Sequence, residues 1–95
     1  MEQRYKDFLI ANGYKQYTPS GQPSTVFAYI RRIYYVCERE RMTWDELARN
    51  INKIVNEYNW GGSKEDFGAK SQNAIISALR RYKEFVSEHA LLGYK

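Results

Sequence analysis

Two stretches of the sequence place hydroxyls, guanidiniums and amides at helical spacing. In the first stretch, residues 25, 29, 32 and 36 (Thr, Tyr, Arg and Val) are four, three and four residues apart, and Arg31 and Tyr35 flank them. Because one turn of an α-helix takes about 3.6 residues, Thr25, Tyr29 and Arg32 share one side of a helix. A short hydroxyl, a phenol and a guanidinium can contact the phosphates and base edges of DNA. This side of the expected helix is therefore a candidate nucleic-acid contact.

The second stretch lies near the end of the chain and adds amide side chains. Its polar residues fall on one face of an expected helix, and this face also includes Glu84. Its candidate contact residues are Lys70, Gln72, Asn73, Ser77, Arg80 and Arg81. The first turn of that helix, residues 70–73, offers free backbone N–H groups and the positive end of the helix dipole, which suit a phosphate. Asn and Gln can also pair with adenine through two hydrogen bonds.

The positive charge of the chain is concentrated in these two stretches. The formal net charge is +4 at pH 7. Residues 14–37 contribute +3, through Lys15, Arg31 and Arg32, and residues 70–83 contribute +4, whereas residues 38–69 between them sum to −2. If the two basic stretches are neighbours in the fold, they form a face of nearer +7 than +4. If they are not, the charge serves only solubility, as it does on many surface helices.

The residues that most often perform catalysis or hold metals are scarce. His89 is the single histidine, near an expected helix end, and Cys37 is the single cysteine, on the apolar side of a helix. One Cys and one His cannot form a zinc site of the usual spacing. The run 62–71 is only superficially like a phosphate-binding loop, because Ala69 separates its Gly and Lys and no strand precedes it. We expect no enzyme activity, no cofactor and no metal.

Length and composition indicate one domain over residues 1–95. The chain has 95 residues, of which 43% are hydrophobic and 27% charged, and this balance is typical of a globular protein. No apolar run approaches the roughly 20 residues of a membrane span, and the N-terminus lacks a signal-peptide pattern. A lone cysteine cannot form an internal disulfide. We therefore expect a cytoplasmic protein that does not contact a membrane.

The elements that must position the polar residues are helices, since no segment shows sustained alternation of apolar and polar residues. We expect an all-α bundle of four helices, with room for a fifth short turn. The first helix is expected to stop at Asn12-Gly13, and the second to begin at a cap at Ser24 or Thr25 and to end near Arg41. The third should begin with a Thr43–Glu46 capping box and stop at Trp60-Gly61-Gly62. The fourth should begin at a cap at Ser71 and end near His89.

Apolar residues at spacings of three and four predict the sides of these helices that face the core. The predicted core residues are Tyr5, Phe8 and Leu9, then Val26, Phe27, Ile30, Ile33, Tyr34 and Cys37, then Leu47, Ile51, Ile54 and Tyr58, and finally Ile75, Ala78, Leu79, Tyr82, Phe85 and Val86. In the loop at residues 14–23, Tyr14 and Tyr17 are expected to pack over the end of the bundle, and stacking on bases is the alternative.

The order of these motifs resembles a known family. The second helix begins Thr-Val-Phe-Ala-Tyr at residues 25–29, an acidic segment reads Thr-Trp-Asp-Glu-Leu-Ala at residues 43–48, and the last helix covers residues 71–85. Together they look like the core-binding, SAM-like N-terminal domain of phage integrases and other tyrosine recombinases, over about residues 3–87.

The resemblance implies a four-helix domain that clasps one face of duplex DNA, with its second and fourth helices against the grooves. It implies DNA contacts at Thr25, Tyr29, Arg32, Lys70, Asn73, Ser77, Arg80 and Arg81. The catalytic domain of the family, with its Arg, His and Tyr constellation, has no counterpart in this sequence. We therefore expect no cleavage and rejoining of DNA by that route.

These observations predict a small, monomeric, non-enzymatic module that binds duplex DNA. Sequence preference would come from Tyr29, Gln72 and Asn73. Phosphate contacts would come from Lys15, Arg31, Arg32, Lys70, Arg80 and Arg81, and six such contacts give a slope of log K against log salt of about −5.

Two alternatives stay open. One is a protein-interaction module, such as a small phage-type protein that binds or inhibits a nucleic-acid-processing enzyme, because Tyr, Trp and Arg are frequent in interface hot spots. An inhibitor that mimics DNA would usually be acidic, which argues against that version. The other alternative is a homo-oligomer that uses Tyr35, Val36 and Trp44.

Overall fold

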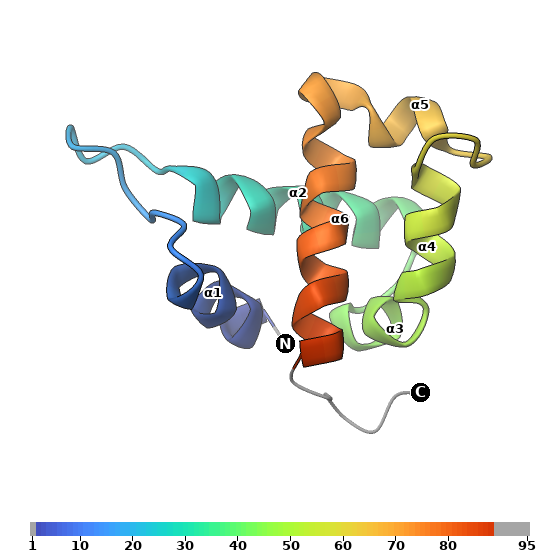
Figure 1. The fold of residues 1–95 in the computed structure, drawn as a ribbon, viewed down its shortest axis with the longest axis horizontal. Helices are drawn as coiled ribbons and strands as arrows, with labels where there is room; N and C mark the ends of the chain where they lie inside the picture. The colour runs from blue at the N-terminus through green and yellow to red at the C-terminus, as the bar shows by residue number, and fades with distance from the viewer. Residues whose placement is uncertain (1, 89–95) are drawn as a thin grey trace.

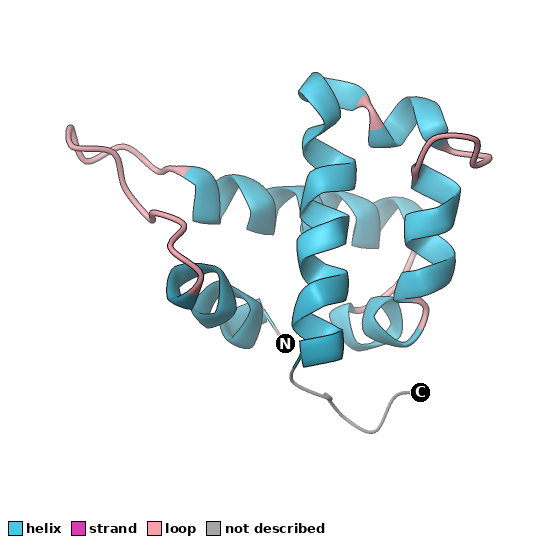
Figure 2. Cartoon of the chain, in the orientation of Figure 1, coloured by secondary structure: helices cyan, strands magenta, loops and turns pink. Residues whose placement is uncertain are grey.

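The structure is a computed structural model that describes residues 2–88, except for the side chains of residues 70–72. Within this range the chain forms helices and loops and no strand (Figure 1; Figure 2). The helices are α1 (Glu2–Ala11), α2 (Thr25–Glu40), α3 (Trp44–Arg49), α4 (Ile51–Tyr58), α5 (Glu65–Gly68) and α6 (Lys70–Glu88). The all-α fold expected from the sequence is confirmed. The expected helix end near His89 lies outside the described residues.

Helix α6 is the centre of the molecule. It packs against each of the other described helices, α1 to α5. In Figure 1 it runs vertically, with α2 crossing behind it, α1 on one side and α3 and α4 on the other. A helix surrounded in this way must be apolar on most sides, which agrees with its buried residues at spacings of three and four.

Most of the predicted core is confirmed. The buried apolar residues come from every long helix: Tyr5, Phe8 and Leu9 from α1, Val26, Ile30, Ile33 and Cys37 from α2, Leu47, Ile51, Ile54 and Tyr58 from α3 and α4, and Ile75, Ala78, Leu79, Tyr82, Phe85 and Val86 from α6. Two predictions for α2 were wrong, because Phe27 is only half-buried and Tyr34 is exposed. Tyr34 instead donates a hydrogen bond to Glu2 and packs its ring on that of Trp44.

The expected third helix is two helices, α3 and α4, joined at Asn50. The capping box at its start is confirmed, since Thr43 Oγ1 accepts from the Glu46 N–H and Glu46 Oε1 accepts from the Thr43 N–H. At Asn50 the backbone leaves the helical region, with φ −109° and ψ 15°. Its side-chain Nδ2 donates to the Glu46 carbonyl at 2.8 Å, a local bond that competes with helix continuation.

The loop before α6 contains a further helix that the sequence did not indicate, the four-residue α5. It packs so closely on the end of α4 that a Cβ on Gly68 would lie 1.9 Å from the Tyr58 carbonyl oxygen. Helix α6 follows α5 after one residue and begins at Lys70, so the expected cap at Ser71 was wrong. In its first turn Asn73 has a φ of +66°, which Asn tolerates better than most residues.

A polar network ties the end of α2 to α4 and to the turn before α5. Glu40 Oε2 accepts hydrogen bonds from the Tyr58 hydroxyl at 2.7 Å and from Lys64 Nζ at 2.7 Å. Lys64 Nζ also lies 3.2 Å from Glu57 Oε1. Burial raises the pKa of Glu40, but the hydrogen bonds from Lys64 and Tyr58 outweigh it and hold the pKa below its usual value.

This network predicts an acid-sensitive contribution to stability. Because the folded-state pKa of Glu40 is lowered, its contribution is complete above the unfolded-state value of about 4.3 and is lost as the pH falls through the folded-state value. Glu40→Gln is therefore expected to lower the free energy of unfolding by about 1–2 kcal/mol at pH 7. Urea unfolding at pH 7 and pH 3 should show this difference shrinking at pH 3. Glu38→Gln, at an exposed position, is the control, and an equal difference at both pH values would contradict the assignment.

Candidate nucleic-acid interface

The crossing of α2 and α6 brings the two predicted contact stretches together. The Tyr14 ring, from the loop after α1, packs on the Tyr29 ring of α2 with centroids 5.4 Å apart. Burial and the neighbouring Tyr14 raise the pKa of Tyr29, and the Arg81 guanidinium of α6 acts in the opposite direction. Arg81 thus interacts electrostatically with both phenols. The loop, α2 and α6 meet at this cluster.

Helical geometry extends the cluster along both helices. Thr25, Tyr29 and Arg32 lie about half a turn around α2 from Phe27 and Tyr34, whose partners Lys6 and Glu2 belong to α1. On α6, positions 73, 77 and 81 follow at intervals of four and share one side. We call this surface the basic face and define it as Tyr14, Lys15, Thr25, Tyr29, Arg32, Asn73, Ser77, Arg80 and Arg81.

The side chains of the basic face differ in exposure. Lys15, Asn73 and Arg80 are exposed, and the others are half-buried. Lys15 is held beside the first turn of α2, because its carbonyl accepts the Val26 N–H at 3.1 Å. Arg32 Nε is buried and has no hydrogen-bond partner within the described part of the chain. A buried donor without a partner is uncommon and calls for an acceptor from outside, such as water or an anion.

The two arginines of α6 are held in place by polar partners. Arg80 Nη2 donates to Asn59 Oδ1 at 2.8 Å, which links α6 to the end of α4. Arg81 pairs with Glu84 one turn further along. Burial lowers the pKa of Arg81, but the bond with Glu84 and the nearby phenols raise it above its usual value. These partners orient both guanidiniums.

Some sequence-predicted contacts do not lie on this face. Arg31 is exposed and lies about 100° around α2 from Arg32, on another side of the helix. The side chains of Lys70 and Gln72 lie outside the described residues. The Asn73 N–H is not free for phosphate, because it donates to the Ala69 carbonyl at 3.0 Å. This bond is the first i→i−4 bond of α6, so any free N–H groups of the helix start precede Asn73.

The charge of the basic face is smaller than the +7 expected from the two stretches. Its described cations are Lys15, Arg32, Arg80 and Arg81, and Glu84 offsets one of them, which leaves a net charge of +3. Arg31 and Lys83 belong to the counted stretches but not to this face, Glu84 lies just beyond the second stretch, and the Lys70 side chain lies outside the described residues.

The structure also bears on the three residues suggested for self-association. Val36 is fully buried and cannot contact a second copy, and Trp44 is half-buried against Tyr5, Tyr34 and Tyr82. Of the three residues suggested for self-association, only Tyr35 is exposed.

Sequence reasoning missed Asn59 and Trp60. The Trp-Gly-Gly run was interpreted only as a helix stop, which it is, because α4 ends at Tyr58. The structure adds that Asn59 holds Arg80 and that the Trp60 side chain is 80% exposed. The signal available in the sequence was a tryptophan directly before two glycines, because such a position lies in a turn and not on the apolar side of a helix.

No described residue suggests redox or metal chemistry. Cys37 is buried, and burial raises the pKa of its thiol to about 11, so almost no reactive thiolate forms at neutral pH. Within residues 2–88 no three His, Cys, Asp or Glu side chains gather as a metal site would require. No described helix has the length and apolar character that crossing a membrane requires.

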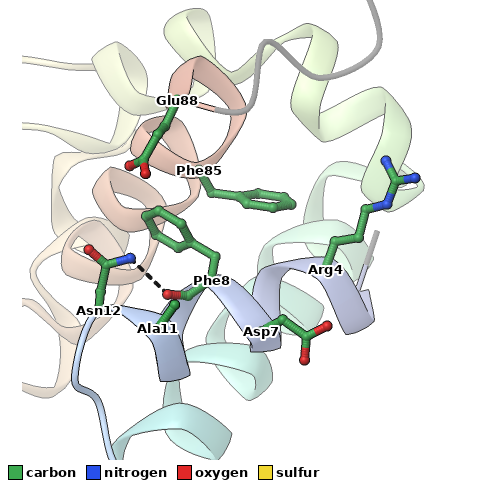
Figure 3. Close-up of a pocket in the computed structure, with 7 residues that line it drawn as sticks. All are labelled: Arg4, Asp7, Phe8, Ala11, Asn12, Phe85 and Glu88. Atoms are coloured by element: carbon green, nitrogen blue, oxygen red, sulfur yellow. Dashed lines mark hydrogen bonds between the residues drawn. The ribbon is translucent and has the colours of Figure 1, made fainter.

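A pocket of about 460 Å³ lies elsewhere, between α1 and the end of α6 (Figure 3). Phe8 and Phe85 form its apolar part, and Arg4, Asp7 and Glu88 are charged residues of its lining. No residue of the basic face lines this pocket. The pocket and the basic face are therefore separate features.

Comparison of the chain with family models, curated proteins and solved structures finds no match. The similarity to the integrase core-binding domain therefore stays an interpretation of the sequence pattern.

Proposed function

We propose that this protein is a duplex-DNA-binding module that uses the basic face. The observation that carries the proposal is the cluster of Tyr14, Tyr29 and Arg81, because it joins contact residues from three separate parts of the chain. A surface of arginines, a lysine, hydroxyls and an amide has the donors that phosphate oxygens accept.

The two helices have different roles in this proposal. The exposed Arg80 and the half-buried Arg81 present guanidiniums from α6 and contact phosphates, as does Lys15 from the loop. Arg32, half-buried on the same side of α2 as Tyr29, is the phosphate contact from that helix. Asn73, exposed on the same side of α6, is the candidate for contact with a base edge.

The experiment is a titration of duplex DNA at several salt concentrations. Each phosphate contact contributes about −0.9 to the slope of log K against log salt, so four described cations predict a slope of about −4. This is shallower than the slope for six contacts, because Arg31 lies on another side of α2 and the Lys70 side chain lies outside the described residues. A slope near zero, or no binding at low salt, would exclude the proposal.

The second candidate, a protein-interaction module, is favoured by a different surface. Tyr34 and Tyr35 are exposed on α2 together with Arg31, on sides of the helix that do not belong to the basic face. Tyr and Arg are enriched in interface hot spots. Replacing Tyr35 and Arg31 by alanine should leave DNA affinity almost unchanged if this surface binds a protein instead.

A further inference from the structure

The feature that carries a further inference is the indole of Trp60, in the turn between α4 and α5. Its side chain is 80% exposed, more than any other large apolar side chain of the described residues, and Tyr17 follows at 55%. Tryptophan has the largest apolar surface of any side chain and is usually well buried. An indole left in water in this way is available to a ligand.

The turn that carries Trp60 is fixed by hydrogen bonds. Asn59 Oδ1 accepts the Trp60 N–H at 2.9 Å, the Gly62 N–H donates to the Asn59 carbonyl at 3.0 Å, and the Lys64 N–H donates to the Glu57 carbonyl at 2.7 Å. The chain at Gly62 lies so close to α4 that a Cβ there would be 2.2 Å from a backbone oxygen. The backbone that carries the exposed indole is therefore fixed.

Trp60 borders the basic face. The oxygen that accepts its N–H, Asn59 Oδ1, also accepts Arg80 Nη2 at 2.8 Å. One amide thus fixes the backbone of the tryptophan and the guanidinium of a proposed phosphate contact. An aromatic ring beside a cation is the combination with which proteins bind single-stranded nucleic acid, because the ring stacks on a base while the cation contacts the backbone.

We propose that Trp60 stacks on an unpaired nucleobase next to the duplex bound by the basic face. This inference rests on the proposed function and specifies its substrate. Inside a duplex both faces of each base are covered by its neighbours, so an indole can stack only on a base that has left the stack. The preferred ligand is therefore duplex DNA that contains an unpaired nucleotide near the bound segment.

The test compares two DNA probes without ends, a closed dumbbell duplex and the same dumbbell with one internal unpaired thymidine. Closed probes are needed because an indole can also stack on a terminal base pair. Wild-type protein is expected to bind the thymidine probe at least about tenfold more tightly, since stacking on one base has an effect of this size. Trp60→Ala is expected to abolish this preference and to leave the affinity for the plain dumbbell and its salt slope unchanged.

Two variants complete the design. Trp60→Phe retains a smaller ring and should keep part of the preference. Tyr17→Ala removes another exposed aromatic ring, which packs on Phe27 in the loop before α2, and should keep all of it. Because the Trp60 side chain is exposed, the melting temperature of Trp60→Ala should match that of the wild type.

The possible results separate this inference from the proposed function. If wild-type protein binds both probes equally and Trp60→Ala has no effect, the base contact is overturned while duplex binding stands. A protein partner is then the alternative for this indole. If wild-type protein binds neither probe at low salt, both proposals are overturned.

Discussion

Replacing Arg80 and Arg81 together by glutamate is expected to lower the affinity for duplex DNA by roughly 100-fold at low salt. Each arginine would lose a charge-assisted hydrogen bond to phosphate, an effect of about tenfold or more per contact. The two glutamates would also repel the phosphates. The salt slope should become shallower by about two, since each lost contact releases about one counterion fewer.

The control for this variant is Arg31→Glu with Lys53→Glu. Each double variant replaces two cations with two anions, so both have the same net charge of zero, starting from +4. Arg31 is exposed on a side of α2 outside the basic face, and Lys53 is exposed on the side of α4 opposite its buried Ile51, Ile54 and Val55. The control should retain most of the affinity. Equal losses in both variants would show that only total charge matters and would contradict a defined face.

Folding of the Arg80 and Arg81 variant must be measured separately. The bond from Arg80 to Asn59 is exposed, and the ion pair of Arg81 with Glu84 is largely solvent-accessible. Such interactions contribute little to stability, since surface pairs are screened by water and salt. The circular dichroism spectrum and melting temperature of the variant should therefore stay close to those of the wild type.

The second large effect concerns the fold itself, where Tyr82→Ala is expected to cost about 3–5 kcal/mol of stability. Tyr82 is fully buried in α6, and its ring lies 5.1 Å from that of Tyr5 and 5.6 Å from that of Trp44, both in edge-on geometry. Its hydroxyl donates to the Trp44 carbonyl at 2.7 Å. The residue thus joins α1, α3 and α6. A domain of this size has only about 5–15 kcal/mol in total, so the variant should be partly unfolded at 37 °C.

Urea unfolding checks this expectation with two comparison variants. Tyr82→Phe keeps the ring but leaves the Trp44 carbonyl without its donor, and should cost about 1–2 kcal/mol. Tyr35→Ala, at an exposed position of α2, should cost less than about 1 kcal/mol. A Tyr82→Ala protein as stable as Tyr35→Ala would contradict the packing around α6.

Local patterns in the sequence predicted much of this fold. The capping box at Thr43 and Glu46 formed because its two hydrogen bonds involve only neighbouring residues. The buried faces of α1 and α6 agree with their periodicity, since an apolar stripe on a helix has to be covered. The break at Asn50 was harder to predict. An asparagine can either stay in a continuous helix or bond the preceding turn with its side chain, and only the packed structure shows the second outcome.

The errors at α2 have one cause. Val26, Ile30 and Ile33 define its buried side correctly, but Tyr34 lies at the edge of the stripe. The apolar periodicity places a residue at the edge of the stripe within about 100° of its centre. It does not show whether a neighbouring helix covers that residue. Here the end of α1 lies beside Tyr34, and the phenol reaches the Glu2 carboxylate at the surface.

The sequence by itself determined the long helices α1, α2 and α6, most of their apolar sides and the two basic stretches, because these properties depend on residues only a few positions apart. Only the tertiary structure decided that Arg81 of α6 lies near enough to Tyr29 of α2 to affect its pKa, that Arg31 is exposed on another side of α2, and that Trp60 and Arg80 share the Asn59 side chain. Those relations depend on how the helices cross around α6, and that crossing is set by contacts between residues far apart in the chain, such as the Tyr5 hydroxyl and the Ala78 carbonyl. For this reason the sequence predicted candidate contacts on two helices, whereas the structure shows which of them share a surface.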